Sequence, residues 1–173
     1  MFLMNEVEVK FIGIDEKDTV RRIKEAGGKK VFEGKIAPFL FDFPDGSLRK
    51  KNQLLRLRKK GAIVELAFKQ KKQYQEAKVA EETELLVSDF DTMRKILSLM
   101  GLKEVSRRPK TRIAFATAHA HYEIDKYAGI PPYLEVEATS IRGLKKAVAA
   151  IGLSMKDAKA WSTRQVMEHY GKK

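Results

Sequence analysis

The chain has 173 residues, a formal net charge of +12 and no cysteine. This length is enough for one domain with a real core, and we expect a single domain across residues 1–173. The lack of cysteine excludes disulfides and thiolate metal sites. The apolar start is too short for a secretory signal, and no apolar run is long enough to span a bilayer. We therefore expect a cytoplasmic protein without membrane contact.

Alternation of apolar and polar residues predicts eight β-strands, and helical spacing of apolar residues predicts four helices. In chain order we expect a strand at 5–12, a helix at 15–26, strands at 30–43, 53–59, 62–71 and 77–87, a helix at 88–100, strands at 110–117, 120–126 and 133–139, and helices at 140–151 and 163–169. Many short strands with few helices predict an α+β, mainly β fold. We expect a closed eight-stranded antiparallel β-barrel with a charged lumen and helices packed outside.

The predicted strands carry ordered charge on one face. In the first strand Glu6, Glu8 and Lys10 alternate with apolar residues, so all three side chains point the same way. The pattern recurs in the later strands at Arg56 and Arg58, at Lys69, at Glu82 and Glu84, at Lys110 and Arg112, at Glu123 and Asp125, and at Glu135 and Glu137. A solvated face with weak cross-strand ion pairs is the alternative reading, but it rarely keeps both alternate positions charged so consistently.

These residue types suit a polyphosphate and a metal ion. Two carboxylates one stride apart repel each other unless a cation lies between them, and clustered carboxylates bind hard cations such as Mg²⁺ or Mn²⁺. The guanidinium groups of Arg56 and Arg58 match phosphate oxygens bidentately, while Lys10, Lys69 and Lys110 add point charges. Acids for a metal and bases for phosphate in one lumen predict a polyphosphate–metal site.

The charged motifs also resemble a known family. The E-x-E-x-K strand at Glu6–Lys10, the Arg56–Arg58 strand and the acidic strands at 122–125 and 133–137 follow one another in the order found in the CYTH superfamily. These triphosphate tunnel metalloenzymes include class IV adenylyl cyclases, thiamine triphosphatases and inorganic triphosphatases. The resemblance runs from about residue 5 to residue 139.

The resemblance implies roles for the charged residues. It implies a divalent cofactor, Mg²⁺ or Mn²⁺, and catalytic roles for Glu6, Glu8 and Lys10. The phosphate-binding residues would be Lys10, Arg56, Arg58, Lys69, Lys110 and Arg112. The metal ligands would be Asp125, Glu135 and Glu137 for one ion, and Glu6 and Glu8 for a second ion and the attacking water. Glu82, Glu84 and Glu123 would line the lumen without an assigned role.

Three functions remain open at this point. The favoured one is metal-dependent hydrolysis of inorganic triphosphate, a nucleoside triphosphate or thiamine triphosphate. The second is a class IV adenylyl cyclase that makes cyclic AMP and pyrophosphate from ATP. The third is a non-catalytic binder of polyphosphate or RNA, which we disfavour because the aromatic residues lie mostly inside strands rather than among basic residues. Trp161 is expected to pack or cap rather than to stack on a base, and the oligomeric state stays open.

Overall fold

The computed structural model describes residues 2–72 and 76–172. The described residues form nine strands and five helices, all of whose bounds follow in chain order: β1 (Phe2–Ile12), α1 (Glu16–Glu25), β2 (Lys29–Asp42), α2 (Ser47–Lys50), β3 (Gln53–Lys60), β4 (Ile63–Lys72), β5 (Lys78–Val87), α3 (Phe90–Leu99), β6 (Lys103–Arg107), β7 (Lys110–Ala116), β8 (Ala120–Lys126), β9 (Tyr133–Ala138), α4 (Ile141–Ala150) and α5 (Thr163–His169). All eight predicted strands and all four predicted helices are confirmed. Among the described elements, the sequence reading missed the short elements α2 and β6.

The strand order confirms the predicted fold class. Hydrogen bonds connect the strands in the order β3-β4-β5-β1-β9-β8-β7-β2-β6, and β3 also pairs with β2. Eight strands therefore close into a mainly antiparallel β-barrel, and β6 is an additional strand on β2. No helix among the described residues is long and apolar enough to cross a membrane.

The chain divides into two compact units. Apart from the chain start, the first comprises residues 34–72 and 80–110, and the second comprises 5–33, 76–79 and 111–172 of the described chain. The prediction of a single domain across residues 1–173 stays a prediction.

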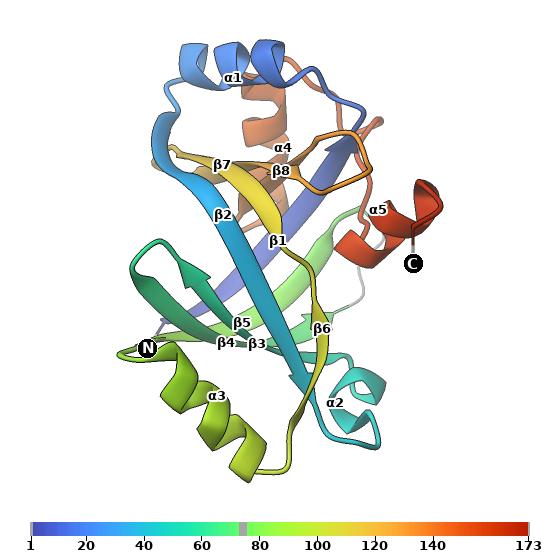
Figure 1. Ribbon diagram of the computed structural model, residues 1–173. Helices are drawn as coiled ribbons and strands as arrows, with labels where there is room; N and C mark the ends of the chain where they lie inside the picture. Colours follow the sequence, from blue (N-terminus) through green and yellow to red (C-terminus); the bar gives the residue numbers. More distant parts are fainter. Residues whose placement is uncertain (1, 73–75, 173) are drawn as a thin grey trace. The chain divides into compact units, whose positions relative to one another are not determined.

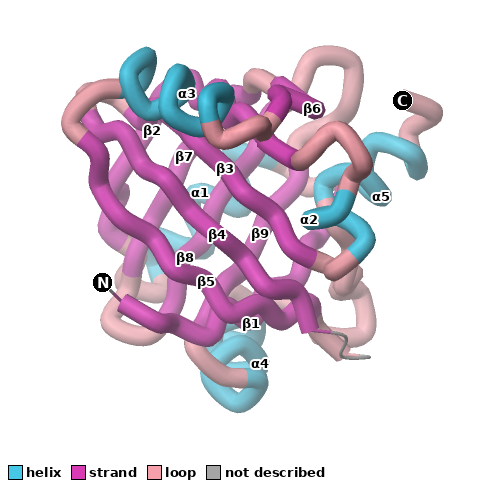
Figure 2. The backbone as a smooth tube through the Cα atoms, turned by 90° about the horizontal axis from the view of Figure 1, so that it is seen from below, coloured by secondary structure: helices cyan, strands magenta, loops and turns pink. Residues whose placement is uncertain are grey.

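In the first unit, β3 pairs along its whole length with β4, and the two run side by side in Figure 2. The apolar side chains of these strands and of β2 pack under α3, where Leu57 and Leu97 are buried. Phe39 of β2 meets Phe90 of α3 edge to face, with 5.0 Å between ring centroids. The last residues of β2 also pair with β6 (Figure 1).

In the second unit, the outward faces of β1, β7, β8 and β9 form the core together with α1 and α4. Val9 of β1 and Val136 of β9 are buried in this core beside Leu144 of α4. The buried hydroxyl of Tyr122 donates to the carbonyl of Ala147 in α4 at 3.0 Å, which fixes the helix to the sheet. The apolar face of these strands thus packs against the helices, as expected for helices packed outside. The charged half is left for the opposite face.

Candidate functional site

Strand pairing in the second unit aligns the charged residues in rows. Directly opposed residues of antiparallel strands point to the same face of a sheet. The register of β1, β9, β8 and β7 produces three consecutive rows: Glu8, Glu137 and His121; then Lys10, Glu135 and Glu123; then Tyr133, Asp125 and Arg112. Two-residue alternation within each strand puts all three rows on one face. Residues that are far apart in the sequence become neighbours in this way.

The central feature of this face is the amine of Lys10. Its Nζ lies 2.7 Å from Glu8 Oε1 and 2.6 Å from Glu135 Oε2, and its side chain is only 1% exposed. Lys78 of β5 also binds Glu8 Oε1, at 2.6 Å. The buried amine is held firmly by these ion pairs, because a buried carboxylate that lost its cationic partner would cost free energy.

A second buried cation, Arg112, stands in the third row. Its Nε lies 2.6 Å from Asp125 Oδ1 and its Nη2 lies 2.7 Å from Asp125 Oδ2, a bidentate pair in which Asp125 is fully buried. Arg112 also forms an ion pair with Glu123 and lies 3.8 Å from Glu135. The hydroxyl of Tyr133 donates to Asp125 Oδ2 at 3.3 Å. These contacts fix the guanidinium plane.

We call Glu8, Lys10, Lys78, Arg112, Glu123, Asp125 and Glu135 the Lys10 cluster. Burial alone would lower the pKa of the Lys10 amine, but Glu135 and Glu8 raise that pKa above its ordinary value. Burial and Glu8 would raise the pKa of Glu135, yet Lys10 and Arg112 outweigh them and the pKa is lowered. Burial likewise opposes the charge on Arg112, but Glu123 and Asp125 hold its pKa well above the ordinary value. These groups are therefore ionised at neutral pH.

The donor chemistry of this face partly fits a divalent cation. Within the described chain, no three Asp, Glu or His side chains are arranged as a ready metal site. The Lys10 cluster nevertheless contains four carboxylates against three cations, and Glu137 adds another carboxylate opposite Glu8. Such an excess of oxygen ligands suits Mg²⁺ or Mn²⁺. Glu8, Glu135 and Glu137 fit this role better than Asp125, both of whose oxygens bind Arg112.

The first unit holds a second charged group, which we call the Arg56 cluster: Arg56, Arg58, Glu65, Lys69, Glu82 and Glu84. Arg56 Nη2 lies 3.1 Å from Glu82 and 3.4 Å from Glu84, and Lys69 Nζ lies 3.1 Å from the other oxygen of Glu82. Arg58 forms an ion pair with Glu65, directly opposite it on β4. Burial, and next the charge of Glu65, raise the pKa of Glu84 above its ordinary value. Here three cations face three carboxylates.

Most of the predicted site residues thus fall into one of two groups. The Lys10 cluster contains six of them: Glu8, Lys10, Arg112, Glu123, Asp125 and Glu135. The Arg56 cluster contains five: Arg56, Arg58, Lys69, Glu82 and Glu84. Glu6 is buried on β1, Glu137 is partly buried on β9, and Lys110 is partly buried at the first residue of β7. The roles assigned to these residues stay predictions.

Sequence reasoning missed Lys78 and Tyr133 as members of these groups. A signal for each was present, since Lys78 continues the alternation of Glu82 and Glu84, and Tyr133 that of Glu135 and Glu137. Lys78 was overlooked because it stands at the first residue of its strand, and Tyr133 because a tyrosine in a strand usually indicates packing.

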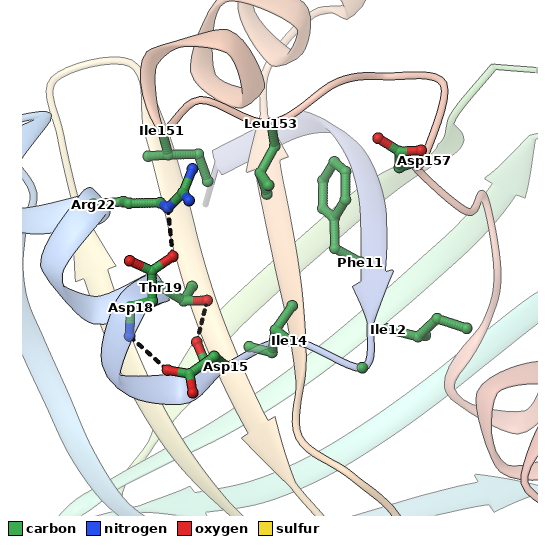
Figure 3. A pocket seen from close by; sticks show the side chains of 11 residues that line it. Phe11, Ile12, Ile14, Asp15, Asp18, Thr19, Arg22, Ile151, Leu153 and Asp157 are labelled. Carbon is green, nitrogen blue, oxygen red and sulfur yellow. Dashed lines mark hydrogen bonds and ion pairs between the residues drawn. The ribbon is translucent and has the colours of Figure 1, made fainter.

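A small pocket of the second unit is not this site. It has a volume of about 270 Å³ and lies between the start of α1 and the stretch after α4 (Figure 3). Its polar groups serve the helix: Asp15 accepts from the Asp18 backbone N–H at 2.7 Å, and Asp18 pairs with Arg22 at 2.6 Å. None of the predicted site residues lines it.

Comparisons with known proteins find a family model and a curated relative that match most of the chain. The family model for the CYTH domain matches residues 4–160. A Methanocaldococcus jannaschii protein named "Putative adenylate cyclase MJ0240" is 30% identical over 135 residues, which are 78% of this chain and 77% of that protein.

Two solved structures are similar in fold. One is described as "a putative adenylate cyclase" from Vibrio parahaemolyticus; it has a TM-score of 0.80 and 18% identity, and the match covers 96% of this chain and 99% of that one. The other, from Hippeastrum, is described as "Putative adenylyl cyclase HpAC1" with a dominant triphosphatase activity. Its TM-score is 0.65 at 13% identity, and the match covers 99% and 97% of the two chains.

Proposed function

Since this chain belongs to the CYTH family, we propose that it hydrolyses a triphosphate in a reaction that depends on a divalent metal. The observation that carries the proposal is the Lys10 cluster, in which buried cations and an excess of carboxylates share one face. Burial on this scale is costly for a purely structural group. Clustered cations and carboxylates are what a metal–polyphosphate complex needs for binding.

The cations of the cluster would bind and orient the phosphate oxygens. Lys10 offers a point charge and Arg112 a planar fork, whose Nε and Nη2 hold Asp125 and whose Nη1 faces Glu123. Charge in the transition state of phosphoryl transfer spreads over the oxygens of the transferred group, so fixed cations stabilise it without reorganising. The bonds from Asp125 and Glu135 keep both cations in place before substrate arrives.

The carboxylates would hold the metal and the attacking water. Glu8, Glu135 and Glu137 would hold a Mg²⁺ or Mn²⁺ ion, and a bound ion of this kind would neutralise charge on the phosphate oxygens. Glu6 and Glu8 would accept hydrogen bonds from the water that attacks the terminal phosphorus. Arg56, Arg58 and Lys69 of the Arg56 cluster are proposed as further phosphate-binding residues.

An adenylyl cyclase is the second candidate, because the Methanocaldococcus jannaschii relative carries that name. The Hippeastrum structure supports the hydrolase reading, since a dominant triphosphatase activity is ascribed to that protein. The two reactions need the same cations and differ in the phosphorus that is attacked. Hydrolysis releases orthophosphate, whereas cyclisation of ATP releases pyrophosphate and cyclic AMP.

Product analysis tests the proposal. The purified chain is incubated with inorganic triphosphate, ATP and thiamine triphosphate, each with Mg²⁺ or Mn²⁺, beside the variants Glu6→Gln and Glu135→Gln. Glu25→Gln serves as the matched control, because Glu25 is exposed on α1, where it pairs with Arg21 of the same helix.

We expect orthophosphate from the wild type and from Glu25→Gln, and loss of it in the two site variants. Cyclic AMP together with pyrophosphate would replace the hydrolase by the cyclase. If triphosphate binds and no product forms with either metal, the catalytic proposal is wrong and a binding protein remains.

A further inference from the structure

The stretch between α4 and α5 pairs with β1 beside the Lys10 cluster. The Lys159 N–H donates to the carbonyl of Lys10 at 2.8 Å, and the Lys10 N–H donates to the carbonyl of Lys159 at 2.9 Å. The two residues form an antiparallel bridge, in which opposed side chains share a face. Lys159 therefore adds a cation on the face that carries the Lys10 amine, although sequence reasoning did not include it in the site.

Trp161 lies two residues further on and borders the same face. The chain is extended both at the Lys159 bridge and at Ser162, so Trp161 stands about 7 Å from Lys159 along the segment. The Nζ of Lys159 lies over the indole ring, 5.7 Å from its centroid, so both side chains lie on one side of the segment. Trp161 also packs against the buried cluster that contains Tyr133, a residue of the row next to Lys10 and Glu135.

This packing leaves part of the indole accessible. Trp161 is only partly buried, whereas Tyr133 is fully buried. His169, an exposed residue at the end of α5, lies 5.2 Å from the indole with its ring tilted by 48°. An indole with an open part, bordered by an imidazole and an ammonium group, can accept a flat aromatic ring by stacking.

We propose, on the basis of the proposed function, that Trp161 stacks on the base of a nucleoside triphosphate whose phosphates bind the Lys10 cluster. The order of the groups suits this substrate, because its aromatic base and its distal phosphates lie at opposite ends of one molecule, as Trp161 and the Lys10 amine lie on either side of the Lys159 bridge. The charge suits a neutral base: Lys159 repels a cationic ring such as the thiazolium of thiamine triphosphate. Trp161 and Lys159 thereby select a nucleotide over thiamine triphosphate.

Intrinsic fluorescence gives a direct test, because Trp161 is the only tryptophan of the chain. The full-length protein with Mg²⁺ is titrated with adenosine β,γ-imidotriphosphate, inorganic triphosphate and thiamine triphosphate, with excitation where adenine does not absorb. Calorimetry on the same samples gives the three dissociation constants. We expect the nucleotide analogue to quench the indole, and inorganic triphosphate to bind with little quenching.

Two variants and a control sharpen the test. Trp161→Ala should weaken the affinity for the nucleotide analogue about tenfold relative to the affinity for inorganic triphosphate. This is the effect expected when one base–aromatic stack is lost. Lys159→Gln should narrow the preference for the nucleotide over thiamine triphosphate. Phe43→Leu, which removes an exposed aromatic ring of the first unit, is the matched control and should change neither ratio.

Each outcome separates the inference from the proposed function. If inorganic triphosphate binds but the nucleotide does not quench Trp161, or if Trp161→Ala weakens both ligands equally, the stacking role is wrong and the triphosphate site stands. If no triphosphate ligand binds at all, the proposed function fails and the inference fails with it.

Discussion

Replacing Lys10 by methionine tests whether charge governs the Lys10 cluster. Methionine keeps an unbranched apolar chain of similar length, so the variant removes the charge with little change in packing. It leaves Glu8 and Glu135 buried near each other without the amine that both contact, at 2.7 and 2.6 Å in the native protein. Removing one member of a buried ion pair costs about 3–5 kcal/mol, and we expect a loss in this range at neutral pH.

The pH dependence of the loss identifies its cause. In the native protein the pKa of Glu135 is lowered. Its ionised form therefore stabilises the fold above the pKa that Glu135 has in the unfolded chain, and this stabilisation is lost as the pH falls through the folded-state pKa. In Lys10→Met we expect burial and Glu8 to outweigh Arg112 and to raise the pKa of Glu135, so the variant should lose stability as the pH rises through that pKa. The deficit should therefore shrink in acid.

Urea denaturation of both proteins across the acid-to-neutral range measures this deficit. Lys78→Met is the matched control: Lys78 contacts Glu8 but is more exposed than Lys10, so its loss should be smaller. Added Mg²⁺ should restore part of the stability of Lys10→Met by binding the two carboxylates. A deficit of equal size at every pH would refute the electrostatic reasoning and point to packing.

Three further predictions concern single contacts. Arg112→Lys keeps the charge but loses the fork that binds Asp125, so urea denaturation should show a loss of about 1–3 kcal/mol and calorimetry a weaker affinity for triphosphate. Glu84→Gln should keep or raise the thermal midpoint at neutral pH, because the raised pKa of Glu84 means that its ionised form is disfavoured in the folded state; a lower midpoint would contradict this. Leu97→Ala and Leu144→Ala empty buried positions in the first and second units and should each cost about 2–5 kcal/mol. If residues 1–173 form one domain, both should shift the same single unfolding transition, whereas separate transitions would contradict that prediction.

The strands and their charged faces could be predicted from the sequence because both depend on local order. Alternation with a period of two fixes which residues share a face, and Glu6, Glu8 and Lys10 show this within five positions. The starts of helices depend on local order as well, since Ser140 and Ser162 cap the helices that follow them. The element β6 was missed because it is short and mostly exposed, and only its pairing with β2 makes it a strand.

Partners across strands depend on register, which the sequence does not display. Tertiary pairing decides that Lys10 faces Glu135, that Asp125 holds Arg112, and that Lys78 joins them from β5. It also brings Lys159, from a distant part of the sequence, into a bridge with Lys10. The residue types of the site were therefore determined by the sequence alone, since local alternation selects them. Their pairing was decided by the tertiary structure, because a shift of one residue in register would turn each strand's charged side chains to the opposite face.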